Sequence, residues 1–138
     1  MSSSEPLQDL MPLARTLGMR FLESEPGSVR ASLEYRPELC TSGGVLHGGV
    51  IMALADSTGA SCAFLNLPEI AAGTSTIESK TNFLRAVRSG VVSAASRPLH
   101  VGRTVIVVET EVTDSDGRLV AKVIQTQAVL QPSPQRRG

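Results

Sequence analysis

The sequence predicts a single α+β domain in which one antiparallel sheet curls around one buried helix. The chain has 138 residues, the usual length of one domain. Residues 49–65 are apolar all round and read as a helix enclosed by other structure. Four β-like runs with short connections follow this helix, which is typical of an antiparallel sheet. No repeat of 20–50 residues suggests a solenoid.

A short amphipathic helix and two strands are expected before the buried helix. Apolar residues recur at helical spacing from Leu7 to Leu17, with Ser4 as the N-cap and Gly18 at the end. A Pro-Gly turn joins the two strands. The predicted strands cover 19–25 and 28–35, and a loop covers 36–44.

The runs after the helix alternate as strands do and are expected at 74–84, 90–98, 104–113 and 119–130. Asp114 to Gly117 is a hairpin turn signal. In the last run the apolar residues alternate in one phase up to Val123 and in the other phase from Ile124 onward. This change of phase predicts a β-bulge near Val123.

The predicted organisation is an N-terminal segment and short helix over 1–16, the main domain over 17–130 and a disordered polar tail over 131–138. The amino terminus has no signal-peptide pattern, and no apolar run comes close to the ~20 residues of a membrane span. We therefore expect a cytoplasmic protein that does not bind a membrane.

Composition argues against nucleic acid and metal. The chain has 13 basic and 13 acidic residues, and aromatic residues make up 3%. Neither a basic surface nor a base-stacking platform is expected. Cys40 and Cys62 lie outside any C-x-x-C pattern and only two histidines are present, so no zinc site is expected. Both thiols are interpreted as reduced and largely buried.

Asp56 is the only formally charged side chain between Leu39 and Pro68. Its neighbours are apolar, so we expect it to be buried. A buried carboxylate costs several kcal/mol unless it is paired, hydrogen-bonded or hydrated. Such a group is often retained for chemistry, although a structural acid paired with a hydroxyl or with an N-terminus is the alternative.

Gly48 and Gly49 open the buried helix. Free N–H groups in a first helical turn can stabilise a carbonyl oxygen that gains negative charge, although tight packing would also explain the glycines, and His47 can be a structural histidine. Asp56 lies ~12 Å farther along the helix, too far to act beside Gly48. An antiparallel partner helix would bring the two groups together, which predicts a homodimer with two shared sites.

The run from Gly44 to Gly49, with its histidine and the acid nine residues later, resembles the hotdog-fold acyl-CoA thioesterases, most of all the PaaI-like and 4-hydroxybenzoyl-CoA thioesterase branch. Residues 82–86, 101–104 and 116–121 also resemble this family. The resemblance covers about residues 17–130.

This resemblance implies a sheet wrapped around a long helix, a homodimer and often a dimer of dimers. It implies hydrolysis of a small, medium-chain or aryl acyl-CoA, with CoA as part of the substrate and no cofactor or metal. Asp56 would be the nucleophile or the general base, and the Gly48 N–H would polarise the thioester carbonyl. His47 would orient the loop, and Thr41 replaces the usual Asn or Gln of the branch.

Substrate contacts are expected on both sides of this motif. Because CoA is strongly anionic, basic side chains should meet it at the mouth of the site. Ser75 occupies the place of a hydroxyl that some relatives hold near the acid. The predicted substrate-binding residues are Gly49, Ser75, Arg85, Arg88, Gly102 and Arg103, and the possible walls of an acyl pocket are Met52, Phe64 and Leu65.

Two other functions fit the same scaffold. A non-catalytic acyl-CoA or ligand-binding protein is the main alternative, because Thr41 replaces the amide that the branch uses. A hotdog dehydratase fits less well, since that chemistry requires a histidine base in a different local arrangement. The sequence leaves open which acyl group is bound and whether Asp56 attacks the carbonyl directly or activates water.

Overall fold

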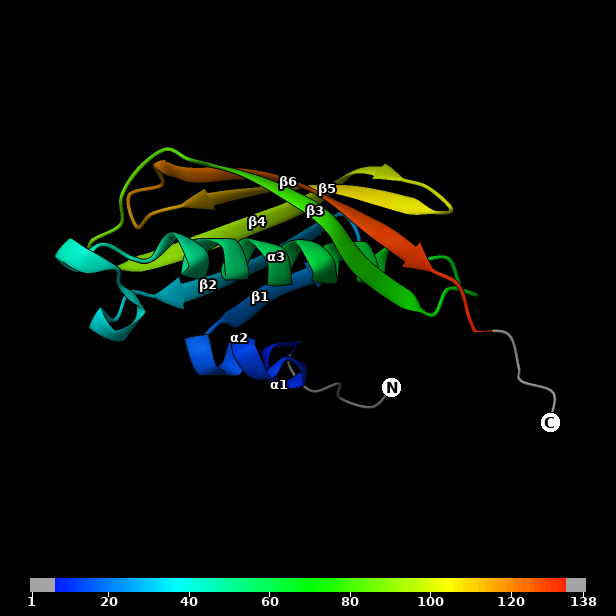
Figure 1. Cartoon of the computed structure of the whole chain (residues 1–138), viewed down its shortest axis with the longest axis horizontal. Coiled ribbons are helices and arrows are strands. Elements are labelled where there is room, and N and C mark those ends of the chain that lie inside the picture. Colours follow the sequence, from blue (N-terminus) through cyan, green and yellow to red (C-terminus); the bar gives the residue numbers. More distant parts are fainter. Residues whose placement is uncertain (1–6, 134–138) are drawn as a thin grey trace.

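A computed structural model describes residues 7–133 and contains one six-stranded sheet (Figure 1). Its strand order is β1-β2-β4-β5-β6-β3, and each neighbouring pair is antiparallel. The α+β prediction is confirmed. The strands are β1 (Arg20–Glu25), β2 (Ser28–Glu34), β3 (Gly73–Phe83), β4 (Val91–Val101), β5 (Val105–Thr113) and β6 (Leu119–Leu130).

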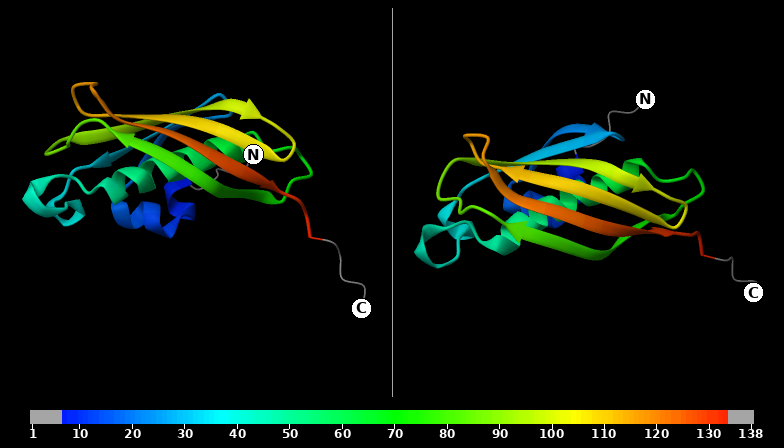
Figure 2. Two further views of the ribbon diagram at one scale, coloured as in Figure 1. Left: turned by 45° about the horizontal axis from the view of Figure 1, so that its top comes forward. Right: turned by 90° about the horizontal axis from the view of Figure 1, so that it is seen from above.

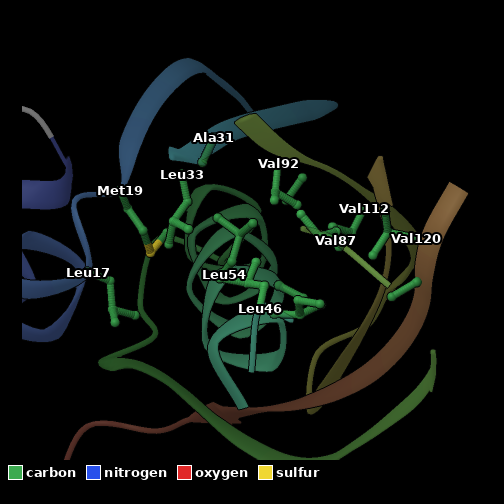
Figure 3. Close-up of a cluster of buried hydrophobic side chains, with 14 of the residues drawn as sticks. Leu17, Met19, Ala31, Leu33, Leu46, Leu54, Val87, Val92, Val112 and Val120 are labelled. Atoms are coloured by element: carbon green, nitrogen blue, oxygen red, sulfur yellow. The ribbon is translucent and has the colours of Figure 1, made fainter. Parts of the chain in front are cut away.

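Helix α3 (Gly48–Leu65) lies along the inner, concave face of the curved sheet (Figures 1 and 2). Leu54 projects from the helix toward Val92 and Val112 on the sheet (Figure 3). All three side chains are at most 1% exposed. One core between helix and sheet therefore holds the domain together.

By length and composition α3 could also cross a membrane, since its 18 residues have a mean hydropathy of 1.3. The sequence-based expectation that no apolar run comes close to this length was therefore too strict. However, 44% of the helix is buried inside the protein, and the core helix of a soluble protein has the same properties. One such helix is weak support for a membrane span.

The N-terminal region forms two short helices instead of the single one predicted: α1 (Leu7–Leu10) and α2 (Pro12–Leu17). Pro12 has no N–H to continue a helix from α1, and Met11 before it is extended, as residues before proline prefer. Gly18 ends α2 in the left-handed conformation with φ 78°. Ser4, the predicted N-cap, lies outside the described residues.

The predicted bulge at Val123 is wrong. Val123, Gln125 and Gln127 are all buried on the inner face, so β6 keeps one phase through this region. Ile124 is 40% exposed on the outer face. The register shift between β5 and β6 lies instead between Val112 and Thr113. Polarity misled the prediction, because buried glutamines face the helix where apolar residues were expected.

Helix α3 is not enclosed on every side. A stripe at helical spacing is exposed or half-buried and consists of Gly49, Met52, Ala53, Asp56, Ser57, Ala60 and Phe64. We call it the open stripe of α3. Strand β3 is the edge of the sheet next to β6 and has no second neighbour within residues 7–133. The open stripe is thus accessible from outside the described chain, as is the unpaired edge of β3.

Candidate active site

The start of α3 has a free backbone amide. His47 is the N-cap residue, and its Nδ1 accepts a hydrogen bond of 2.7 Å from the Gly49 N–H. Gly48 is the first helical residue, whose N–H has no partner within a helix, and it donates to no other group in the described chain. The imidazole thus occupies one of the two glycine amides and leaves the Gly48 N–H available.

A cleft of about 390 Å³ surrounds this amide. Phe83 lies over the glycine, since a Cβ on Gly48 would be 3.2 Å from Phe83 Cζ. Thr41 and Gly48, which were predicted as catalytic, and Arg85, which was predicted to bind substrate, line the same cleft. The cleft is lined by Thr41, Val45, Leu46, Gly48, Ile51, Phe83, Leu84, Arg85, Ala86 and Val87. A second hollow of about 400 Å³ is lined by residues of 17–36 and Val91 and contains none of the predicted site residues.

The loop before the helix is held by two contacts to its glycine carbonyls. Tyr35 Oη donates to the Gly44 carbonyl at 2.8 Å, and Arg88 donates to the Gly43 carbonyl at 3.2 Å. The backbone φ angle is 82° at Gly43 and 72° at Gly44, and residues with side chains rarely adopt such positive values. In this structure Arg88 fixes the loop beside the cleft and does not line the cleft itself.

Asp56 lies on the open stripe and is half-buried, not fully buried as expected. Its Oδ1 accepts hydrogen bonds from Thr76 Oγ1 at 3.0 Å and from Gln125 Nε2 at 3.1 Å. Gln127 Nε2 donates to Thr76 Oγ1 at 2.6 Å. No residue of 7–133 donates to Oδ2. We call Asp56, Thr76, Gln125 and Gln127 the acid cluster.

The hydroxyl beside the acid belongs to Thr76, not to Ser75 as predicted. Ser75 is exposed and pairs with Ala128, so it lies on the outer face of the sheet. The register shift between Thr76 and Glu78 is what sets this phase. Sequence reasoning also missed Gln125 and Gln127, although two glutamines two residues apart in a mostly apolar strand are a usable signal.

Gly102 and Arg103 are remote from the cleft. They lie in the β4–β5 turn, near the pairing of Val105 with Ala128, whereas Leu84 at the cleft bonds to Val120 at the other end of β6. Figure 2 shows this hairpin at the opposite end of the sheet from the loop before α3. A Cβ on Gly102 would be 2.9 Å from the Val105 carbonyl oxygen, so the tight turn itself requires glycine.

The three residues considered as walls of an acyl pocket lie in two different places. Met52 and Phe64 are on the open stripe, 40% and 59% exposed. Leu65 is half-buried and packs against a smaller cluster of buried side chains that includes Val29, Cys62 and Ile106. Cys62 is buried and free, and burial raises the pKa of its thiol to about 11, so it is an inert thiol. Cys40 is free and half-buried.

The free amide and the acid are separated within one chain. Gly48 and Asp56 are eight residues apart on one continuous helix. At 1.5 Å per residue this is a rise of ~12 Å, so one small carbonyl cannot touch both. An antiparallel sheet curved around one long helix is the hotdog fold.

The comparison with known proteins gives the family. The family model described as "Thioesterase superfamily" matches residues 43–121. Rv1847 of Mycobacterium tuberculosis, which carries a provisional esterase name, is 36% identical over 122 residues, 87% of each chain. This chain belongs to the thioesterase superfamily and is a thioester hydrolase with the hotdog fold.

Solved structures agree. The structure of Rv1847 superposes with a TM-score of 0.86 and covers 90% of this chain and all of that one. A mutant of the thioesterase PA1618 from Pseudomonas aeruginosa is 28% identical with a TM-score of 0.87, covering 95% and 97% of the two chains. The thioesterase HI1161 from Haemophilus influenzae is 26% identical with a TM-score of 0.85, covering 98% and 97%.

Proposed function

We propose that the protein is an acyl-CoA thioesterase that hydrolyses a small, medium-chain or aryl acyl-CoA to the free acid and CoA. Asp56 is the nucleophile or the general base, and the Gly48 N–H polarises the thioester carbonyl. The proposal describes a cytoplasmic enzyme that needs no cofactor or metal. The superfamily membership supports the reaction class, and the geometry of α3 supports the residue roles.

The observation that carries this proposal is the pair of unused groups on α3. The Gly48 N–H and Asp56 Oδ2 have no partners in residues 7–133, yet they are ~12 Å apart along one helix. Two copies with antiparallel α3 helices would bring the Asp56 of one copy to the Gly48 of the other. Each dimer then has two composite sites.

The surface around Asp56 suits a second copy. Met52 and Phe64 on the open stripe are 40% and 59% exposed, and large apolar side chains exposed along one helix face are typical of a contact surface. Strand β3 is 11 residues long and offers unpaired backbone groups at its outer edge. Pairing of β3 with the same strand of a second copy would cover both. Two such dimers forming a dimer of dimers is a further part of the proposal.

The chemistry follows from this placement. The thioester oxygen accepts a hydrogen bond from the Gly48 N–H, which strengthens as negative charge develops on it. Asp56 Oδ2 either attacks the carbonyl carbon or takes a proton from a water that attacks it. Direct attack breaks the C–S bond, forms a mixed anhydride and releases the CoA thiolate, which gains a proton. Water then hydrolyses the anhydride and regenerates the carboxylate.

The CoA group would lie across basic residues contributed by both copies. Arg85 lines the cleft beside Gly48. In an antiparallel pair, the β4–β5 turn of one copy lies at the end of the dimer where the other copy has its cleft. Arg103 would then complete the anion-binding surface that Arg85 begins.

The test is the Asp56→Asn variant, assayed with short, medium, long and aromatic acyl-CoAs and a dye that reacts with free thiol. We expect kcat/KM to fall by about 10³-fold or more, because the amide neither attacks nor takes a proton. Asp9→Asn is the matched control, since Asp9 is an exposed carboxylate on α1 that lines no part of the cleft and should leave the rate unchanged. Full activity in a folded Asp56→Asn protein would refute the proposal, and saturable binding of acyl-CoA by the native protein without thiol release would favour the non-catalytic alternative.

A further inference from the structure

Gln125 is an unusual residue to find beneath a core helix. Its side chain is fully buried, at 0% exposure. Its Nε2 donates to Asp56 Oδ1 at 3.1 Å, while its Oε1 has no hydrogen-bond partner among the described residues. The carboxylate fixes this orientation, because an amide oxygen turned toward it would be repelled. The side chain therefore has one polar contact, and that contact is to Asp56.

Gly59 is what makes room for this side chain. A Cβ at position 59 would lie 1.9 Å from Gln125 Oε1 and 2.7 Å from its Cδ. Real side chains do not approach so closely, so the Gln125 amide can rest here only because residue 59 is glycine. Glycine inside a helix is destabilising relative to alanine. The helix thus contains an unfavourable residue at the place where the amide passes it.

A second glutamine fixes the other donor to Asp56. Gln127 is also fully buried, and its Nε2 donates to Thr76 Oγ1. With one of its oxygen's lone pairs occupied in this way, the Thr76 hydroxyl points its own proton at Asp56 Oδ1. Gln127 Oε1 has no partner in the described chain either. Both glutamines donate toward the acid and leave a buried oxygen without a hydrogen bond.

Stability does not account for this arrangement. A buried polar atom without a partner disfavours the folded state, and an apolar side chain of the same shape would remove that penalty. The acid cluster contains two such atoms, the Oε1 atoms of Gln125 and Gln127. What the two glutamines provide is a fixed orientation of one carboxylate.

We propose that Gln125 is a positioning residue for thioester hydrolysis, admitted by Gly59, which together with Thr76 holds Oδ1 of Asp56 and leaves Oδ2 as the reacting oxygen. This inference rests on the proposed role of Asp56. Both donors engage Oδ1, so Oδ2 is the carboxylate oxygen that has no donor among residues 7–133. Correct aim of a reacting atom contributes strongly to rate, since a displacement of about 1 Å can cost ~10²-fold.

The decisive variant is Gln125→Met, which keeps the approximate shape and removes both polar atoms. We expect kcat to fall by about 10–100-fold with KM unchanged. The midpoint of thermal unfolding should stay the same or rise, because an unpartnered buried oxygen is removed. Gly59→Ala provides a second route to the same loss of kcat, since it displaces the amide while every polar group of the cluster remains present.

Thr58→Val is the matched control. Thr58 is a fully buried residue on the same helix, and its hydroxyl bonds only to the Leu54 carbonyl, so its loss should leave kcat unchanged. In an Asp56→Asn background, Gln125→Met should cause no further loss, because there is no reacting carboxylate left to position.

Three results would overturn the inference. Wild-type kcat in Gln125→Met, with Asp56→Asn inactive, would remove the positioning role and leave the proposed function intact. A fall in kcat accompanied by a lower midpoint of thermal unfolding in Gln125→Met would make Gln125 a structural residue. Wild-type kcat in folded Gly59→Ala would show that the amide position does not matter. An active Asp56→Asn protein would instead refute the proposed function.

Discussion

The candidate site has a backbone amide as the reactive group at one end and a side-chain carboxylate at the other. At the start of α3 the cleft is open and mostly apolar, and its reactive group is the backbone N–H of Gly48. In the middle of the same helix the reactive group is the side chain of Asp56, held from the sheet by Thr76 and Gln125. One end needs space around a backbone amide. The other needs a carboxylate with a fixed orientation.

This difference explains which residues each end requires. A backbone amide is presented by removing side chains, so glycines and an N-cap histidine are sufficient there. A carboxylate is oriented by adding donors, and these come from strands far away in sequence. Changes at the cleft should therefore act through access and through the N–H, whereas changes at the acid cluster should act through orientation.

After the loss of Asp56, the largest effect is expected when the Gly48 N–H is removed. Gly48→Pro deletes this donor at the first helical position, where proline is tolerated, and His47 already has the extended conformation that precedes proline (φ −63°, ψ 134°). We expect kcat to fall by about 10²–10³-fold, the usual loss for one oxyanion-hole donor. Initial rates with the best acyl-CoA of the panel provide the measurement.

Gly48→Ala is the matched control for this change. It adds the same Cβ near Phe83, which is 50% exposed and able to move, but keeps the N–H. We expect alanine to reduce kcat by less than about tenfold. Equal losses in the proline and alanine variants would mean that crowding against Phe83, and not the amide, is responsible.

A smaller effect is expected on the outer face of the sheet, on the side away from α3. Glu109 is held by Arg97 at 2.7 Å and by Lys122 at 3.2 Å. The hydrogen bond from Arg97, followed by the contact with Lys122, lowers the pKa of the Glu109 carboxyl despite the opposing effect of burial. Both carboxylate oxygens of Glu109 thus have a cationic partner, whereas the Oε1 atoms of Gln125 and Gln127 have no hydrogen-bond partner among the described residues.

Because the folded-state pKa is lowered, the contribution of Glu109 to stability is present above the ordinary carboxyl pKa and is lost as the pH falls through the folded value. Glu109→Gln should lower the free energy of unfolding at pH 7 by about 1 kcal/mol, allowing for screening at exposed Arg97. The difference from wild type should shrink in acid, and kcat should not change. Urea unfolding at several pH values measures this, and a deficit independent of pH would contradict it. Glu34→Gln is the matched control, because Glu34 is an exposed strand carboxylate that forms no ion pair among the described residues.

Patterns within single elements were enough to predict the fold. The apolar run of α3, the alternating strands and the turn signals each depend on residues close in sequence, and the glycine pair with His47 marked the start of the helix correctly. The break between α1 and α2 was missed because the apolar spacing continues through Pro12, whose missing N–H interrupts the hydrogen bonds without changing that spacing.

The acid cluster could not be predicted in the same way. Asp56 meets Gln125 across 69 positions of sequence, and only the strand order and register place them together. The register shift beside Thr76 decides whether that hydroxyl or Ser75 faces the helix. When a polar residue faces the core, the apolar alternation of the strand is interrupted, and this looks like a change of phase if the residue's distant partner is not known. For this reason a bulge was wrongly predicted at Val123.

The most direct test of the central claim is complementation between two inactive variants. When Asp56→Asn and Gly48→Pro chains are co-expressed, mixed dimers contain one site with an intact Asp56 from one copy and an intact Gly48 from the other. Random pairing should restore about a quarter of wild-type activity per site. If each site were formed within a single chain, the mixture would be no more active than the two variants assayed separately, and the shared-site account would be wrong.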